Sequence, residues 1–380
     1  MIRDTVRDLA RGEFAKRAIE IDRTEEFPRE NFERLKELGL MGVMVPESHG
    51  GAGADTLSWV LTLEEIAYAC PSTALGLAAH HSLCTLPIWN FGTEEQRRRF
   101  VPPLARGEVM GSYGLTEPGA GSDSGGTRTT ALVDGDHFRV SGAKTFITNG
   151  SHASTFVLAV KTDPAQTGSR GISALIVERS TPGFTIGKKE SKLGMRGSDT
   201  VQLSLDGCRV PRANLLGELH DGFKIFMNTL DGGRIGIAAL ALGIAQAAFE
   251  RACAYSKERH AFGKPIAAFQ GVANLIADMA VDLDASRHLV YHSARLKDAA
   301  QPYTREAAVA KLFASEAAMR VTHDAIQVLG GYGYMQEYEV ERMCRDAKLC
   351  TIGEGTSEIQ RIVIARQVLG KVAGVERSSA

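Results

Sequence analysis

The fold is decided by residues 129–142, which read TTALVDGDHFRVSG. Two runs of alternating apolar and polar residues meet at Asp134-Gly135, and an Asp-Gly pair between such runs is a strong signal for a β-hairpin. Three further β-rich runs follow, TFVLAVKT, SALIVERS and TVQLSLDGCRV, and no helix-length segment separates them. This order disfavours βαβ units and predicts an antiparallel barrel or sandwich over residues 112–221.

Helical patterning lies on both sides of this β-rich region. In residues 1–111, FGTEEQRRRF places Thr93 three residues before Gln96, which is the capping box that opens a helix. In residues 222–380, GGRIGIAALALGIAQAAFERACAYSKER is apolar on more than one side, as expected of a helix buried within a bundle. The chain is therefore predicted to be an α+β protein of several domains.

A last helix is predicted near the C-terminus, preceded by a single acid. Ser357 and Gln360 have the spacing of a second capping box, and Gly370 has the character of a helix end. Glu354 lies between two glycines just ahead of this helix. An acid in that place ordinarily complements the helix dipole, so position alone does not assign a chemical role to Glu354.

The composition is that of a soluble globular protein. The 380 residues are 44% apolar and 23% charged, and a formal net charge of -1 does not favour nucleic acid or anionic lipid. No run approaches the ~18 unbroken apolar residues of a membrane span. The N-terminal MIRDTVRDLARGEFAKRA mixes acidic and basic residues, unlike a secretory signal or a transit peptide. We expect a cytoplasmic protein with no nucleic-acid partner and no membrane span.

The cysteines and histidines indicate no metal site. The cysteines form no CxxC pair and lack histidines at zinc-like spacing, so we expect reduced core residues and no bound metal. They are Cys70, Cys84, Cys208, Cys253, Cys344 and Cys350. The patterns GxxxxGK[ST], GxSxG and HExxH are also absent, and GAGSDSGG does not open a helix in a βαβ unit.

One polar, glycine-rich segment lies at the boundary between the helical and β-rich regions. Residues 113–123 read YGLTEPGAGSD, where Thr116 and Ser122 accompany backbone N–H groups freed by Gly119 and Gly121. Such a cluster suits a polar or anionic ring ligand. A surface loop without a ligand is the alternative interpretation of the same residues.

Five motifs occur in a fixed order and spacing along the chain. They are YGLTEPGAGSD (113–123), KLGMRGSDT (192–200), ERHAFGKPIAAFQ (258–270), QVLGGYGY (327–334) and EGTSEIQR (354–361). Together they resemble the acyl-CoA dehydrogenase family of flavoproteins across essentially the whole chain. A sixth segment, HHSLCTLPIWNFGTEEQ (80–96), is most similar to the short-chain, butyryl-type members.

The resemblance implies a fold and a reaction. The implied fold has an N-terminal α-helical domain over 1–111, a central antiparallel β-barrel domain over 112–221 and a C-terminal four-helix-bundle-like domain over 222–380. Members of the family hold FAD, oxidise an acyl-CoA thioester to trans-2-enoyl-CoA in fatty acid β-oxidation, and pass the electrons to electron-transfer flavoprotein. Most are homotetramers, and some of their FAD contacts cross between subunits.

The resemblance also implies roles for single residues. Glu354, the acid of the EGT motif, matches the family's base, which removes the α-proton while the β-hydrogen leaves as hydride to flavin N5. The implied FAD contacts are Tyr113, Leu115, Thr116, Gly121, Ser122, Phe146, Ile147, Thr148, Arg259, Phe262, Gln270, Gln327, Val328, Gly330, Gly331, Thr356, Ser357 and Glu358. The implied substrate contacts are Ser122, Asp231, Arg234, Gly353 and Gly355, although Arg234 alone would more often form an ion pair.

Three positions depart from the family pattern. Gly353 precedes the matched base where relatives commonly have Tyr, so we expect a larger pocket that admits short-chain, α-branched or cyclic acyl groups. Phe146 replaces a Trp beside the flavin, which keeps an aromatic ring but changes its coverage. Glu339 stands where relatives often have Pro, and the sequence offers no account of that change.

Two other functions are compatible with the same motifs. One is an acyl-CoA oxidase on this fold, which would deliver its electrons to oxygen; such oxidases are usually much longer chains, so the length favours the dehydrogenase. The other is a flavin-bound structural or nucleic-acid-binding homologue without catalysis. The presence of Glu354 and the absence of a basic tail disfavour that second alternative.

Overall fold

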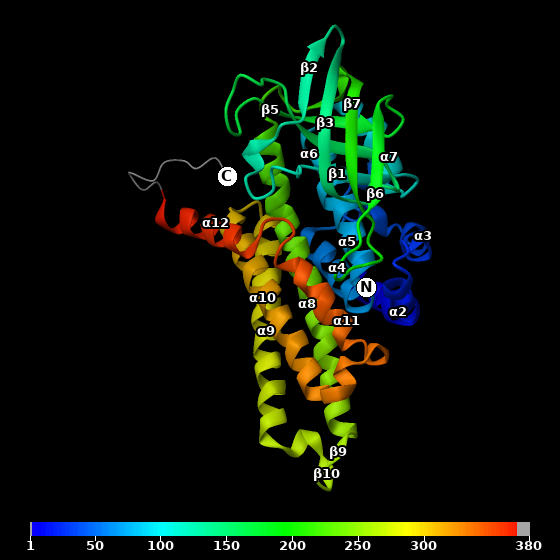
Figure 1. Ribbon diagram of the computed structural model, residues 1–380, viewed down its shortest axis with the longest axis vertical. Coiled ribbons are helices and arrows are strands. Elements are labelled where there is room, and N and C mark those ends of the chain that lie inside the picture. Colours follow the sequence, from blue (N-terminus) through cyan, green and yellow to red (C-terminus); the bar gives the residue numbers. More distant parts are fainter. Residues whose placement is uncertain (1, 371–380) are drawn as a thin grey trace.

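The computed structural model describes residues 2–370. Residue 1 and residues 371–380, with the C-terminal VERSSA segment and the end of the third predicted domain, lie outside the described residues. Helices come first along the chain, strands follow, and long helices complete it (Figure 1). The predicted α+β fold with a helical, a sheet and a second helical part is confirmed.

The N-terminal part is helical. Its helices are α1 (Ile2–Leu9), α2 (Ala15–Thr24), α3 (Arg29–Glu37), α4 (Thr56–Ala69), α5 (Pro71–Ala78), α6 (Leu86–Phe91) and α7 (Glu94–Ala105), with π-helical turns η1 (Ala10–Phe14) and η4 (Ala79–Thr85). The predicted capping box at the start of α7 is confirmed. Gln96 N donates to Thr93 Oγ1 at 3.2 Å, and Thr93 N donates to Gln96 Oε1 at 3.0 Å.

The central part is a sheet of eight strands. They are β1 (Met110–Gly114), β2 (Thr130–Asp134), β3 (His137–Thr148), β4 (Ala153–Lys161), β5 (Ile172–Glu178), β6 (Phe184–Lys189), β7 (Thr200–Pro211) and β8 (Leu215–Leu216). The predicted hairpin is confirmed, because β2 and β3 pair antiparallel with Asp134 opposite His137. Gly135 in its turn has a φ of +62°, a conformation that glycine adopts without strain.

The predicted closed antiparallel barrel is not confirmed. The strand order is β6-β7-β3-β2-β4-β5-β8, with β1 paired to β4, and no pairing joins the end strands β6 and β8 in residues 2–370. The pairing is also mixed, since β1 runs parallel to β4 and β2 meets β4 in a parallel bridge. A sequence pattern reports local strand neighbours, whereas closure depends on tilt and stagger summed over the whole sheet.

The C-terminal part is built on long helices. They are α8 (Gly222–Glu258), α9 (Gln270–Asp298), α10 (Thr304–Leu329), α11 (Val340–Cys350) and α12 (Ser357–Leu369), with short strands β9 (His260–Ala261) and β10 (Lys264–Pro265) and the 3₁₀ turn η8 (Gly330–Tyr334). In Figure 1, α8, α9 and α10 extend away from the sheet, and β9 and β10 lie at the far tip.

Helix α8 forms the centre of the molecule. Its residues between Ile235 and Ala248 are almost all buried, and they pack in one continuous core with apolar residues of α4 and α10. Within residues 2–370, α8 is the one helix with the length and composition of a membrane span, but 83% of its most apolar window is buried inside the protein. A core helix of a folded domain has the same composition.

Candidate active site

Glu354 lies on the short loop that joins α11 to α12. Its backbone is left-handed, with a φ of +53°, and Gly355 follows with a φ of +95°. A left-handed glutamate is unusual, and such conformations concentrate at functional sites. Thr356 then caps α12, because its Oγ1 accepts a hydrogen bond from Ile359 N at 3.4 Å. The predicted end of α12 at Gly370 is confirmed.

Two side chains hold the loop by its carbonyl groups. Lys311 Nζ, from α10, donates to Gly355 O at 2.7 Å. Gln360 Nε2, from α12, donates to Gly355 O at 2.9 Å and to Glu354 O at 3.3 Å. The predicted capping box of Ser357 with Gln360 is therefore wrong: Thr356 is the cap, and the buried Gln360 amide turns toward the loop instead.

Glu354 is half-buried, and its carboxyl group has no polar partner among the described residues. Its Oε2 is inaccessible to solvent and has no hydrogen-bond partner among the described residues. It packs against α8 at Gly233, where an added Cβ would lie 1.9 Å from Oε2. Burial raises the pKa of Glu354 to about 7, although the positive charges of Lys311 and Arg234 oppose that rise. A carboxyl group that titrates near neutral pH in a buried site is suited to general base catalysis.

Further polar groups face Glu354 without partners. Tyr113 Oη is buried and makes no hydrogen bond within the described chain, and burial together with the Glu354 charge raises the tyrosine pKa well above its usual range. Arg234 is 4% exposed and its Nε is also without a partner. Buried polar atoms are normally satisfied. Their accumulation here therefore indicates a site that binds a ligand with polar groups.

The two predicted substrate residues on α8 form an ion pair. Arg234 Nη1 donates to Asp231 Oδ1 at 2.5 Å, and Thr304 Oγ1 donates to Asp231 Oδ2 at 2.7 Å. The pair belongs to a single helix, three residues apart, so Arg234 does not bridge two helices. It leaves Nε and part of the guanidinium available beside Glu354.

The predicted flavin residues of the sheet form one surface. Thr145 N donates to Thr116 O at 2.9 Å, which ties the 113–123 segment to β3, and Ser112 Oγ donates to Thr148 O at 2.6 Å, which ties β1 to the end of β3. Phe146 is 67% exposed with a left-handed φ of +58°. An exposed aromatic ring held in a strained conformation, with half-buried threonines beside it, fits a planar apolar ring that has polar edges. Gly121 and Ser122 are exposed on the adjoining loop, while Leu115 and Ile147 are buried below.

The remaining predicted FAD residues form a second group far from Glu354. Arg259, Val328, Gly330 and Gly331 line a pocket of about 450 Å³ with Tyr255 and Tyr332. Phe262, which is 95% exposed, and Gln270 lie at the same tip of the helices, by β9, β10 and the start of α9 (Figure 1). Gln327 precedes this pocket on α10. A single chain thus does not bring these residues to the Glu354 loop, whereas Thr356, Ser357 and Glu358 adjoin it directly.

Glu339, which the sequence left unexplained, has a structural role. It is left-handed, with a φ of +63°, and its carboxylate pairs with Arg342 Nη2 at 2.6 Å and with Arg251 Nη2 at 3.1 Å. Burial alone would raise the pKa of Glu339, but the two arginines outweigh it and lower the pKa. Proline cannot adopt a positive φ, so this turn differs in backbone from one that contains proline.

Three family models together match nearly the whole chain. The acyl-CoA dehydrogenase N-terminal domain matches residues 1–108, the middle domain residues 112–208 and the C-terminal domain residues 220–369. The chain belongs to the acyl-CoA dehydrogenase family. A Bacillus subtilis protein named "Probable acyl-CoA dehydrogenase" is 54% identical over 97% of both chains. A short-chain specific acyl-CoA dehydrogenase of Clostridium acetobutylicum is 50% identical over 97% of both chains.

Solved structures of the family are similar over the same length. Butyryl-CoA dehydrogenase of Megasphaera elsdenii has a TM-score of 0.95 and 45% identity, with 97% of each chain covered. A chain from work on the electron transferring flavoprotein of Acidaminococcus fermentans has a TM-score of 0.94 and 46% identity over 98% of each. A prolyl acyl carrier protein oxidase has a TM-score of 0.94 and 35% identity, with 97% of this chain and 98% of that chain covered. Since an oxidase of equal length has this fold, chain length does not separate dehydrogenase from oxidase.

Sequence reasoning missed two residues of this acyl-CoA dehydrogenase family site. Lys311 and Gly233 both contact the Glu354 loop; Lys311 lies outside the segments that suggested chemistry, and Gly233 lies inside one but was not itself predicted. A signal for Lys311 existed, because it is the one cation in the alanine-rich run AAVAKLFASEAA. Gly233 adjoins Arg234 in LDGGR, but only the folded chain shows what its missing side chain makes room for.

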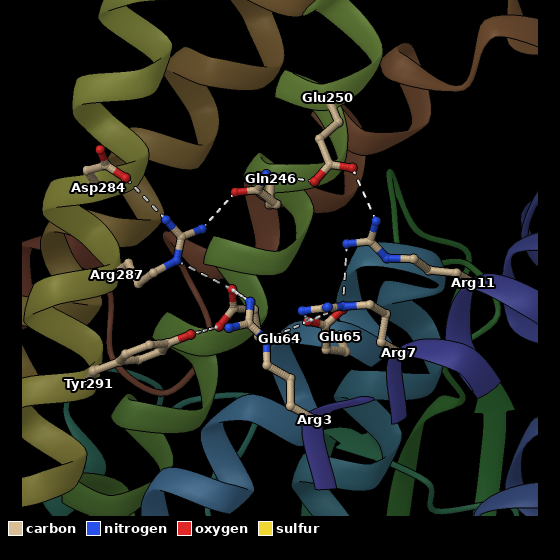
Figure 2. Close-up of polar contacts among 10 residues, drawn as sticks. All are labelled: Arg3, Arg7, Arg11, Glu64, Glu65, Gln246, Glu250, Asp284, Arg287 and Tyr291. Atoms are coloured by element: carbon tan, nitrogen blue, oxygen red, sulfur yellow. Dashed lines mark hydrogen bonds and ion pairs between the residues drawn. The ribbon is translucent and has the colours of Figure 1, made fainter. Parts of the chain in front are cut away.

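A cluster of arginines around two buried glutamates, Glu64 and Glu65, lies between α1, η1, α4, α8 and α9, and sequence reasoning did not predict it. We name it the arginine–glutamate network; Figure 2 shows its members, Arg3, Arg7, Arg11, Glu64, Glu65, Gln246, Glu250, Asp284, Arg287 and Tyr291. Glu65 Oε1 accepts from Arg3 Nε at 2.9 Å and from Arg7 Nη2 at 2.8 Å. The arginines point inward onto the glutamates, so the network fastens the first helix to the rest of the family fold.

Proposed function

We propose that this chain is an FAD-dependent acyl-CoA dehydrogenase in which Glu354 removes the α-proton of the acyl-CoA thioester. The observation that supports this most strongly is the Glu354 carboxyl group. Its Oε2 is shut off from solvent, it has no polar partner among the described residues, and its pKa is about 7. FAD supplies the hydride acceptor when it is bound. Glu354 would take the proton and bound FAD would supply the hydride acceptor, which accounts for both hydrogens that the thioester loses as it becomes a trans-2-enoyl-CoA.

The Glu354 loop offers more than a base. The Glu354 N–H donates to no acceptor among the described residues, although the carbonyl groups of Glu354 and Gly355 are both bonded. A free N–H beside the base is suited to the thioester oxygen, which gains negative charge as the α-proton leaves. The loop would then hold the base and the oxyanion donor on one residue.

The residues of two chains would hold FAD. In one subunit they are Tyr113, Leu115, Thr116, Gly121, Ser122, Phe146, Ile147, Thr148, Thr356, Ser357 and Glu358. Arg259, Phe262, Gln270, Gln327, Val328, Gly330 and Gly331 lie too far along the helices to reach the same cofactor, so we infer that they serve the FAD of a neighbouring subunit in a homotetramer. The exposed Phe262 ring and the pocket beside Arg259 support such a contact.

The substrate contacts would lie on α8 and on the Glu354 loop. We infer that Ser122, Asp231, Arg234, Gly353 and Gly355 meet the acyl-CoA. Gly353 leaves open space where relatives commonly have tyrosine, since a Cβ there would meet nothing closer than Leu349 O at 3.6 Å. This space supports a short-chain, branched or cyclic acyl group as substrate. Leu83 borders the same site, because its Cδ2 lies 3.1 Å from the Cβ position of Gly233.

We infer that the electrons pass to an electron-transfer flavoprotein in the cytoplasm. The alternative is an oxidase that reduces oxygen to hydrogen peroxide, since a solved oxidase of similar length has the same fold.

We also propose a division of the chain into three domains at residues 111/112 and 221/222. Each part would contribute one wall of the site: helices below the acyl group, the sheet beside the flavin, and α8 with the Glu354 loop between them.

Anaerobic bleaching of the flavin tests this proposal. The purified holoenzyme is mixed with a panel of straight, branched and cyclic acyl-CoA thioesters, and the flavin absorbance is followed without oxygen. The proposal expects bleaching by at least one of these thioesters, with enoyl-CoA formed in equal amount. Retention of full absorbance with every thioester would leave the inactive flavin-bound homologue as the better account. Hydrogen peroxide formed in air at the rate of enoyl-CoA would instead identify an oxidase.

A further inference from the structure

Lys311 is a buried cation without an ion pair. It lies on α10, is 0% exposed, and no carboxylate of residues 2–370 lies within ion-pair distance of its ammonium group. Within the described residues, Lys311 makes one hydrogen bond, in which Nζ donates to Gly355 O at 2.7 Å. A buried charge that lacks a counter-ion is costly to fold around. Methionine would fill a similar volume without that cost, whereas the ammonium group bonds the Glu354 loop.

The charged and titratable groups around Lys311 come from four elements. They are Glu354 on the loop, Cys350 on α11, Arg234 on α8 and Glu358 on α12. Burial lowers the pKa of Lys311 to about 8, and burial raises the pKa of Cys350 to about 12, so the thiol stays neutral. Arg234 is already paired with Asp231, and Glu358 is exposed to solvent. Glu354 is thus the buried acid on which the Lys311 charge acts.

We propose that Lys311 is the positioning residue of the reaction, holding the Gly355 carbonyl so that Glu354 keeps its left-handed turn and stabilising the ionised Glu354 carboxylate with its charge. This inference rests on the proposed role of Glu354 as the base. The turn needs such a hold because Glu354 and Gly355 both have positive φ. Lys311 Nζ and Gln360 Nε2 converge on one carbonyl oxygen from opposite helices, α10 and α12.

Two variants separate the two parts of this role. In Lys311→Gln the amide keeps a donor for Gly355 O but loses the charge, whereas Lys311→Met loses both. We expect both variants to shift the acidic limb of the kcat/KM profile upward by about one pH unit, because an opposite charge near a carboxyl group lowers its pKa by this order. We expect only Lys311→Met to lower the plateau at high pH as well, by about tenfold or more, through a misplaced base.

A matched control is available in the sheet. Lys161 is also buried, forms no ion pair in the described chain, and donates to backbone carbonyls of a loop, Gly168 O at 2.6 Å and Arg170 O at 2.5 Å. Lys161→Met removes the same groups at a distance from Glu354. We expect it to lower the melting temperature without moving the pH profile, so a shift in all three variants alike would overturn the proposal.

Infrared spectroscopy measures the titration of Glu354 directly, without enzyme turnover. The carbonyl band of protonated Glu354, identified by its loss in Glu354→Gln, is titrated in the holoenzyme without substrate. Its midpoint should rise in both Lys311 variants and stay unchanged in Lys161→Met. An unchanged midpoint and an unshifted profile would overturn the role of Lys311 while leaving Glu354 as the base. Full turnover of Glu354→Gln would overturn the proposed function instead.

Discussion

Glu65 is buried, Glu354 is half-buried with its Oε2 shut off from solvent, and their surroundings shift their pKa values in opposite directions. Glu65 lies in the arginine–glutamate network (Figure 2), where Arg3 Nε and Arg7 Nη2 donate to its Oε1 at 2.9 Å and 2.8 Å. Burial alone would raise the pKa of Glu65, but these hydrogen bonds outweigh it and lower the pKa. Glu354 has burial without such bonds, and its pKa rises to about 7.

For these two acids, the hydrogen bonds from arginine decide whether the pKa falls or rises. The lowered pKa of Glu65 favours its ionised carboxylate near neutral pH, which suits this acid to fastening helices. Glu354 is held close to its titration point, which is the condition for taking a proton from a carbon acid. Four predictions test this contrast, from the largest expected effect to the smallest.

Glu354→Gln should remove catalysis and leave stability intact. Loss of a positioned general base costs about 10²–10⁴-fold in kcat. The variant should still bind FAD, which the visible spectrum reports. At pH 8 it should melt at or above the wild-type temperature, because a buried carboxylate without partners destabilises the fold when ionised. Steady-state kinetics and calorimetry measure the two effects. Near-normal turnover would contradict the role of Glu354.

Glu65→Gln should have the reverse effect. It leaves Arg3 and Arg7 without their shared carboxylate and should lower the free energy of unfolding by about 3 kcal/mol. This value is at the low end of the range for removing one partner of a buried ion pair, because both arginines remain in contact with solvent. Urea unfolding measures this loss. The kcat of the folded fraction should stay within about twofold, since the network does not touch the Glu354 loop. A selective loss of kcat with unchanged stability would break the comparison.

Gly233→Ala should disturb the base without changing any charge. The added Cβ would lie 1.9 Å from Glu354 Oε2, so the carboxyl group must move. A displacement of about 1 Å costs on the order of 10²-fold in rate. Gly12→Ala, in the N-terminal helical part, is the matched control, because nothing lies within 4 Å of its Cβ position and alanine has the higher helix propensity. Equal activity of the two variants would show that the contact at Gly233 does not hold the base.

The two acids should also separate by pH. Glu354 must be ionised to act, so kcat/KM should fall about tenfold for each pH unit below about 7. Glu65 has a lowered folded-state pKa, so its contribution to stability is full above the unfolded pKa of about 4.3 and is lost as the pH falls through the folded value. Between pH 5 and pH 7 activity should therefore decline while the contribution of Glu65 to stability, read as the difference in free energy of unfolding between wild type and Glu65→Gln, holds. A parallel decline of both would mean that unfolding, not protonation of Glu354, limits the rate.

Much of the fold followed from local patterns. The Asp134-Gly135 hairpin, the Thr93–Gln96 capping box and the helix end at Gly370 each depend on a few neighbouring residues, and each was confirmed. A local pattern gave the wrong cap where two neighbouring residues can each cap the same helix. Ser357 and Gln360 have capping-box spacing, but Thr356 takes the cap because Gln360 is drawn into the core by the Glu354 and Gly355 carbonyls.

The amino-acid sequence by itself determined the order of helical and β-rich parts, the family motifs and the position of Glu354 on a glycine-flanked turn, because these depend on residues close together in the chain. Only the tertiary structure decided what surrounds that acid. Lys311 reaches Gly355 across 44 residues, and Gly233 meets Glu354 from the centre of α8. A pKa near 7 is set by burial and by distant charges, and both come into existence only when the helices pack.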